Sequence, residues 1–391
     1  MRKFLFQGAV FLIAGSLLLA GRGIQTYNCT DKLGCVAVPE GAPIQIGSLL
    51  TLSGPDADLV EARGVEIAVA DKGKLLDHPI ELIQQDDLCD EDGGRDGATR
   101  LAAIEQIVGV IGTACSGSSV PAAKILSDKG MVLISPSSTA PSLTDPATHQ
   151  PGFLRTIYND KAQGQAVAKF AFNVLGARRM VTFHDGTPYP QQLQEAACQS
   201  FIQLGGECVQ QIQLSSGQDI NAILESFVGQ KPDVLYFPVY TEDGVAITKG
   251  VVTAGLSSIA LISSDALMTS DFLQETNPVS EGMYLSGPAE VTEPQAFVAS
   301  YKAHYTDDPA DPYHLQAYDA TILLFNAIEK VGVTSNKTLY IPRQALRDAL
   351  YATRGMQGLS GPIDCSPSGD CAQPNIEIFQ IVNNNFKAIY P

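Results

Sequence analysis

The strongest constraint on this chain is a repeated alternation of short apolar strands with segments of helical length. From Ile44 the sequence predicts strand, helix and strand in turn, and the same alternation begins again after residue 157. Strands that alternate with helices predict βαβ units, in which a parallel sheet is covered by helices on both faces. Because 391 residues are too many for one compact core, we expect two α/β lobes.

The predicted elements follow the pattern of apolar residues. In the first half we expect strands at 44–50, 80–85, 107–111 and 132–134, and helices at 59–72, 94–106 and 118–129. In the second half, strands at 179–183, 207–213, 234–237 and 260–262 lie among helices at 160–175 and 191–204. Three further helices are expected at 293–305, 313–331 and 342–354. The tail from Gly361 predicts two strands around the turn Ser366–Gly369.

The first 21 residues have the pattern of a secretory signal peptide. Arg2 and Lys3 precede an apolar run from Phe4 to Ala20, and the small residue Gly21 follows. The run is only slightly shorter than a membrane span, so an uncleaved anchor is the alternative. Arg22 stands where a lipid-modified cysteine would be required. We therefore expect an exported protein, in the periplasm or at the outer face of the cell membrane.

Eight cysteines agree with export to an oxidising compartment. They form four pairs that are close in sequence, and none has the CxxC spacing typical of zinc or redox sites. We expect disulfides within these pairs, although the sequence alone leaves their connectivity open. The pairs are Cys29–Cys35, Cys89–Cys115, Cys198–Cys208 and Cys365–Cys371.

Charge and missing motifs exclude several functions. The chain has 25 basic and 42 acidic residues, a net charge of −17, which argues against nucleic acid because phosphate would be repelled. No GxSxG, HExxH or P-loop motif is present, and no GxGxxG follows the first strand, so we expect neither an enzyme nor a cofactor. The acidic run around Asp86, Asp87 and Asp90 lacks EF-hand spacing, and we interpret it as a solvated loop without a metal.

Two loops that follow predicted strands carry clustered hydroxyl groups. The loop 113–119 contains Ser116, and the loop 135–141 contains Ser137 and Thr139. Open α/β sheets bind ligands beyond the carboxyl ends of their strands, and helix N-termini favour anions. These loops therefore indicate an anion-binding site, with simple helix capping by serine as the alternative.

Seven segments together resemble the leucine/isoleucine/valine-binding proteins of bacterial ABC importers. They are Gln85–Asp90, Val110–Ser116, Ile134–Pro141, Leu154–Thr156 with Asp160 and Gln163, His184–Tyr189, Glu281–Met283 and Tyr318–Ala320. They follow the family's order from about Ile44 to the C-terminus. The resemblance implies a type I periplasmic-binding-protein fold, in which two Rossmann-like lobes with parallel sheets are joined by three hinge crossovers around a ligand cleft.

The resemblance also implies a domain organisation. Residues 1–21 would be the signal peptide and 22–43 a linker with a small disulfide loop. Residues 44–157 with 288–357 would form the N-terminal lobe, and 158–287 with 358–391 the C-terminal lobe. The crossovers would lie near 156–159, 286–288 and 355–361. The family further predicts the disulfide Cys89–Cys115, a closure that contributes about 3–4 kcal/mol to stability in the chain-entropy model.

The function that the resemblance implies is that of an extracytoplasmic receptor. It would capture an amino acid of branched-chain type, or a related small amine or amide, by cleft closure, and deliver it to the membrane permease of an ABC importer. A ligand sensor of the same fold that acts on a signalling partner is the alternative. We expect a monomer that binds no nucleic acid.

The site residues are carried over by matching positions. Ser116 and the backbone N–H of Thr139 would bind the α-carboxylate, while Asp265, the Ser137 carbonyl and the Thr139 hydroxyl would bind the α-ammonium. Tyr189 and Tyr240 would come from the second lobe, and Tyr313 would line the side-chain pocket. Asp265 stands where the family usually has Glu, and the loop 52–59 is short and has no aromatic residue. These departures leave the ligand's side chain open.

Overall fold

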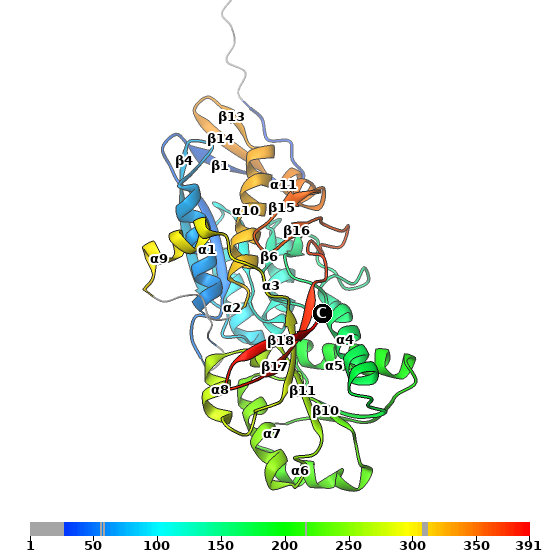
Figure 1. Ribbon diagram of the computed structural model, residues 1–391. Helices are drawn as coiled ribbons and strands as arrows, with labels where there is room; N and C mark the ends of the chain where they lie inside the picture. The colour runs from blue at the N-terminus through cyan, green and yellow to red at the C-terminus, as the bar shows by residue number, and fades with distance from the viewer. Residues whose placement is uncertain (1–26, 55–56, 58, 216, 307–311) are drawn as a thin grey trace, which may run out of the picture.

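The computed structural model describes residues 27–54, 57, 59–215, 217–306 and 312–391, which form two α/β lobes (Figure 1). The expected signal peptide lies outside these residues. Within them, none of the helices combines the length and apolar character needed to cross a membrane.

The first lobe is built on a six-stranded sheet. Its order is β3 (Lys74–Leu75), β4 (His78–Asp86), β2 (Ile44–Leu50), β5 (Ile107–Gly112), β6 (Leu133–Ser135) and β7 (Phe153–Arg155), parallel except between β3 and β4. Alternate residues of β2 face opposite sides, as a pleated strand requires. Ile46 packs with helices α1 (Leu59–Lys72) and α10 (His314–Val331), and Leu49 packs with α2 (Glu91–Ala102) and α3 (Ser116–Asp128).

The second lobe is built on a seven-stranded sheet. Its order is β18 (Phe386–Tyr390), β17 (Ile376–Ile381), β12 (Tyr284–Pro288), β11 (Ala260–Ser264), β10 (Val234–Tyr236), β8 (Arg179–His184) and β9 (Glu207–Gln213). Helices α4 (Asp160–Lys169) and α5 (Pro188–Gln203) pack on one face, and α6 (Ile220–Ser226), α7 (Thr241–Thr253) and α8 (Ser270–Thr276) on the other. The two lobes lie end to end (Figure 1).

Part of the segment expected to be a linker is a strand. β1 (Cys35–Pro39) pairs antiparallel with β14 (Thr338–Pro342), which also pairs with β13 (Val333–Ser335). Val36 and Val38 are buried in the first-lobe core, and their alternation with exposed residues explains the strand. The first lobe also carries α9 (Gln295–His304), α11 (Arg343–Tyr351) and the short pair β15 (Met356–Gln357) and β16 (Pro362–Ile363).

The described chain passes between the lobes after β7, between β12 and α9, and again before β17. This third passage comes later than the expected 355–361, because Ile363, Cys365 and Cys371 pack in the first-lobe core. Arg155 holds this segment in place: its side chain is fully buried, and its Nε donates to Asp370 Oδ1 at 2.6 Å. A buried guanidinium requires such a partner, so residues up to Cys371 stay with the first lobe.

The C-terminal hairpin differs from the prediction. On the near side of the turn Ser366–Gly369, β16 pairs with β15 instead of forming a hairpin across the turn, and an isolated antiparallel bridge joins Ile363 to Ala372. The actual hairpin joins β17 and β18 through Asn383 and Asn384, whose φ angles are 53° and 59°. Two-residue hairpin turns favour positive φ at both positions, and asparagine tolerates it better than most residues.

All eight cysteines lie in the described residues and form disulfides. The bonds are Cys29–Cys35, Cys89–Cys115, Cys198–Cys208 and Cys365–Cys371, as expected. The longest loop, 26 residues, is closed by Cys89–Cys115. This disulfide lies beyond the carboxyl ends of β4 and β5, on the side of the first lobe that faces the other lobe.

Candidate ligand-binding cleft

A cavity of about 240 Å³ lies between the two lobes. Both lobes line it with residues that follow the carboxyl ends of their parallel strands, the position expected for ligands in open α/β sheets. Six of the seven residues predicted to contact a ligand line this cavity: Ser116, Ser137, Tyr189, Tyr240, Asp265 and Tyr313.

The first-lobe wall of the cavity is centred on the N-terminus of α3. Ser116 is the first residue of this helix, is 1 % exposed and lines the cavity, and its Oγ accepts from the Ala140 amide at 3.1 Å. The preceding residue, Cys115, supplies no side-chain cap. The first amides of a helix have no intrahelical acceptor and carry partial positive charge. This wall is therefore suited to a carboxylate.

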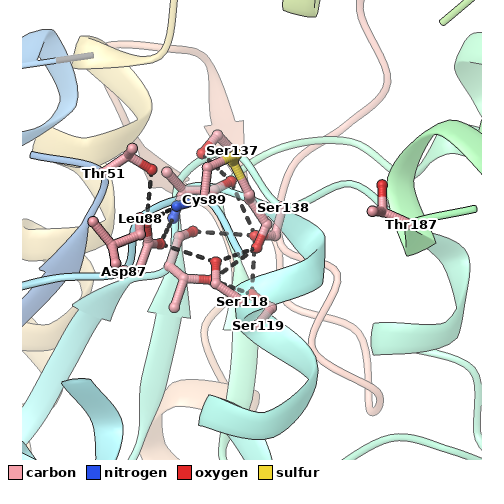
Figure 2. The surroundings of a disulfide bond; sticks show 12 residues. Thr51, Asp87, Leu88, Cys89, Ser118, Ser119, Ser137, Ser138 and Thr187 are labelled. Atoms are coloured by element: carbon pink, nitrogen blue, oxygen red, sulfur yellow. Dashed lines mark hydrogen bonds between the residues drawn. A yellow bond between two sulfur atoms is a disulfide. The ribbon is translucent and has the colours of Figure 1, made fainter. Parts of the chain in front are cut away.

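Asp87 holds this wall in place through hydrogen bonds, and it is not the solvated residue that the sequence suggested. Its side chain is fully buried and accepts from Thr51 Oγ1 at 2.6 Å, from the Ala114 amide at 2.9 Å and from Ser118 Oγ at 3.0 Å (Figure 2). Burial raises the pKa of the Asp87 carboxyl, and these hydrogen bonds partly offset the increase. The bonds fix the loop before α3 to the end of β4.

The two hydroxyl-rich loops are joined to each other. Ser137 Oγ donates to the Ala114 carbonyl at 2.8 Å, and Ser119 Oγ donates to Ser138 Oγ at 2.9 Å (Figure 2). Thr139 is the predicted site residue that does not line the cavity. Its side chain is 1 % exposed, and its Oγ1 has no hydrogen-bond partner within the described residues.

The second-lobe wall is centred on Asp265, which follows β11. Asp265 is 6 % exposed and accepts hydrogen bonds from Gln163 Nε2 and from the hydroxyl of Tyr313. Tyr189 donates its hydroxyl to Ser264 Oγ at 2.7 Å and lies 3.4 Å from Asp265 Oδ1. Burial raises the pKa of the Asp265 carboxyl, and the hydrogen bonds from Tyr313, Gln163 and Tyr189 partly offset the increase. The arrangement offers a buried negative charge to a cation.

A family model described as periplasmic binding protein matches residues 43–385 of this chain. The chain belongs to the periplasmic binding protein family. The family resemblance seen in the sequence and the type I fold are both confirmed. The family is one of binding proteins, and the relatives described next are named as binding proteins rather than as enzymes.

Curated and solved relatives cover most of the chain. The Leu/Ile/Val-binding protein homolog 3 of Brucella melitensis is 24% identical over 352 residues, which are 87% of this chain and 91% of the relative. The isoleucine complex of LivJ from Streptococcus pneumoniae has a TM-score of 0.76 at 21% identity and covers 89% of this chain and 100% of its own. A solute-binding protein from R. palustris in complex with benzoate has a TM-score of 0.75 at 24% identity, covering 89% and 96%. These two structures show the fold alone.

In this periplasmic binding protein, hydrogen bonds join the two lobes both across the cavity and beside it. Tyr313, from the first lobe, donates across the cavity to Asp265 of the second. Beside the cavity, the Ser142 amide donates to Gln192 Oε1 at 2.8 Å, and Gln192 Nε2 donates to Ser142 Oγ at 2.9 Å. Tyr313 has a φ of 87°, a conformation that costs a non-glycine residue about 1–2 kcal/mol and persists only where surrounding contacts fix it.

Sequence reasoning missed several lining residues, which include Thr51, Glu61, Thr241, Thr269 and Asp271. Each follows β2, β10 or β11, so the carboxyl-end rule could have found them if it had been applied to every parallel strand. Among the described residues that line the cavity there is no lysine, arginine or histidine. The described residues also contain no group of His, Cys, Asp and Glu side chains arranged to hold a metal ion.

Proposed function

We propose that this protein is an extracytoplasmic solute receptor that captures an amino acid or a related small amine in the cleft between its lobes. The observation that carries the proposal is the opposition of two poles in one cavity. The N-terminus of α3 with Ser116 stands on the first lobe, and the buried carboxylate of Asp265 stands on the second.

A buried zwitterion needs a partner for each of its charges, because desolvation otherwise cancels the gain from binding. The proposed carboxylate contacts are the first amides of α3 with the hydroxyl of Ser116, and the carbonyl of Ser137 is a proposed acceptor for the ammonium. The proposed ammonium contacts are Asp265 with Tyr189, Tyr240 and Tyr313. Thr139 stays a prediction. Because the poles belong to different lobes, only a closed cleft would hold both ends of the ligand.

Fold alone does not decide which ligand is bound. Of the two solved relatives above, one is a complex with isoleucine and the other a complex with benzoate. The ligand proposed here therefore depends on the chemistry of the two walls. Benzoate has a carboxylate but no ammonium, whereas this cavity has an acidic residue at its second pole.

We further propose that the protein is exported and delivers its ligand to the membrane permease of an ABC importer. The names of the relatives support transport, and the eight paired cysteines support an oxidising compartment. The alternative of a ligand sensor gains no support from these relatives, which are described as binding proteins.

The decisive experiment is mass spectrometry of the ligand released from freshly purified protein, followed by isothermal titration calorimetry with a panel of amino acids. We expect a bound zwitterion, and a dissociation constant in the micromolar range or below for at least one amino acid. A released ligand without a positively charged nitrogen, together with no heat for any amino acid or N-methylated amino acid, would overturn the proposal. Small-angle scattering should show a smaller radius of gyration with ligand if the cleft closes on it.

A further inference from the structure

The ammonium pole of the cavity combines one carboxylate with several aromatic rings. Asp265 lines it together with Tyr189, Tyr240 and Tyr313, and no basic side chain is present among the described lining residues. The pole therefore offers negative charge and aromatic surface. The proposed function by itself does not say what kind of ammonium group such a pole prefers.

Part of the acceptor capacity of Asp265 is already used inside the protein. Gln163 Nε2 and the hydroxyl of Tyr313 donate to this carboxylate, whereas the hydroxyl of Tyr189 donates to Ser264 and lies 3.4 Å from Asp265 Oδ1. An ionised carboxylate has about four acceptor positions. A primary ammonium brings three N–H donors, and a buried donor without an acceptor costs free energy. Such a ligand would bring more donors than Asp265 has positions left, whereas an alkylated ammonium has few N–H groups or none.

The hydroxyls of Tyr189 and Tyr313 are held by hydrogen bonds within the protein, and these two tyrosines line the cavity together with Tyr240. The hydroxyl of Tyr189 donates to Ser264 Oγ at 2.7 Å in a fully buried bond, and the hydroxyl of Tyr313 donates to Asp265. The ring centroids of Tyr189 and Tyr240 lie 5.6 Å apart with an angle of 47° between the planes. The two rings therefore contact each other and present one continuous aromatic wall to the cavity. An aromatic face attracts a cation whether or not the cation carries N–H groups.

We infer that the ligand is a zwitterion whose ammonium group is alkylated, up to a trimethylammonium. Its methyl groups contact the tyrosine rings, its positive charge faces Asp265, and its carboxylate meets the N-terminus of α3. The inference rests on the proposed function, because it keeps the same cavity and the same two poles. It adds the class of ammonium group that the second pole selects.

The test on the unmodified protein uses matched ligand pairs. Calorimetry compares alanine, valine, leucine and phenylalanine, each with its N,N,N-trimethyl derivative, so that the carboxylate and the side chain stay constant within a pair. We expect the trimethyl member to bind at least about tenfold more tightly in the pair with the best-fitting side chain. If the free amino acid binds equally or more tightly in every pair that binds, the inference fails and the proposed function stands. If no member of any pair binds, the proposed function fails, and the inference fails with it.

A pair of variants at one position separates the ring from its hydroxyl. We expect Tyr240→Leu to weaken binding of the preferred trimethyl ligand by about tenfold more than Tyr240→Phe does, because only phenylalanine keeps the aromatic face. Tyr284→Leu removes a partly buried ring of the same lobe outside the cavity and serves as the matched control. Thermal melts show whether each variant is folded. Equal losses in Tyr240→Phe and Tyr240→Leu would mean that the ring face does not recognise the ligand, and would overturn the inference.

Discussion

The two walls of the cleft use different chemistry and are held in place by different means. The first-lobe wall is centred on backbone amides and hydroxyls at the N-terminus of α3, tied together by the Cys89–Cys115 disulfide and by the buried Asp87, and Glu61 also lines it. The second-lobe wall is centred on Asp265 and phenol rings, with Asp271 beside them, and Asp265 accepts a hydrogen bond from Tyr313 of the opposite lobe. The first wall is held by contacts within its own lobe, whereas the second wall also includes a hydrogen bond from the opposite lobe.

This difference assigns separate roles to the two walls. A wall of partial charges on a fixed helix terminus tolerates an empty site, since water can satisfy its amides. A buried carboxylate is costly without partners, so the second wall gains more from a cation and from contact with the other lobe. We therefore expect loss of charge at Asp265 to affect affinity most, and changes in the first wall to act through stability or through single hydrogen bonds.

The largest effect is expected from Asp265→Asn, which removes the charge and keeps the shape. Loss of the partner of a buried ammonium costs about 2–5 kcal/mol of binding, a factor of tens to thousands in affinity. Calorimetry with the identified ligand measures this loss, and the melting temperature without ligand should change little. Asp219→Asn is the control, because Asp219 caps α6 outside the cavity through the amides of Asn221 and Ala222. Unchanged affinity in Asp265→Asn would mean that Asp265 does not pair with the ligand.

The next largest effect is expected on the stability of the first lobe. Replacing Cys89 and Cys115 by serine opens a 26-residue loop and should lower the free energy of unfolding by about 3–4 kcal/mol. The double serine variant at Cys29 and Cys35, whose separation is 6, should lose only about 2 kcal/mol in the same model. Denaturant titrations of both variants give the comparison. Equal losses of unfolding free energy in the two variants would mean that loop length does not determine how much each disulfide stabilises the protein.

The alternation of strands and helices made most of the fold predictable. The bounds of β2, α1 and β9 agree with the prediction, because each has a clear apolar pattern between turn residues. The C-terminal hairpin was misplaced, because Pro367 and the flanking cysteines gave a stronger turn signal than Asn383 and Asn384. Local signals of this kind do not reveal which turn joins paired strands.

The family pattern predicted six residues that line the cavity, but it did not predict their hydrogen-bond partners. Asp87 looked solvated because it lies in an acidic run, yet its partners Thr51 and Ala114 come from two other strand ends. The contact of Gln163 with Asp265 joins residues 102 positions apart. Such contacts depend on how distant segments come together when each lobe folds, and a short stretch of sequence does not show this.

A smaller effect is expected from Ser116→Ala in the first wall. The variant removes one hydroxyl near the carboxylate pole and leaves the helix amides in place, so affinity should fall by about tenfold. Ser127→Ala, near the other end of α3, is the matched control and should leave affinity unchanged. Titration of both variants with the same ligand decides the point. A loss as large as that of Asp265→Asn would contradict the view that the first wall distributes its binding over several groups.

The smallest effect on affinity is expected from pH, through the Asp265 carboxylate of the second wall. Burial raises the pKa of Asp265 above its ordinary value, so acidification neutralises this carboxylate at a higher pH than it would an exposed aspartate. Binding of a cationic group needs the ionised form. Affinity should therefore weaken as pH falls toward the raised pKa.

Stability without ligand should change with pH in the opposite direction. An acid with a raised pKa in the folded state binds more protons there than in the unfolded chain, so the free energy of unfolding falls as pH rises through the window above the ordinary aspartate pKa. Asp160, Asp87 and Asp319 contribute to the same slope, because burial raises the pKa of each, and Asp160→Asn separates the contribution of Asp160 from that of Asp265. Asp265→Asn should remove the pH dependence of affinity, whereas Ser116→Ala should lower affinity at every pH and keep the dependence. If the affinity of Asp265→Asn still changed with pH, the titrating group would be another residue. The contrast between the two walls would then not explain the pH dependence of binding.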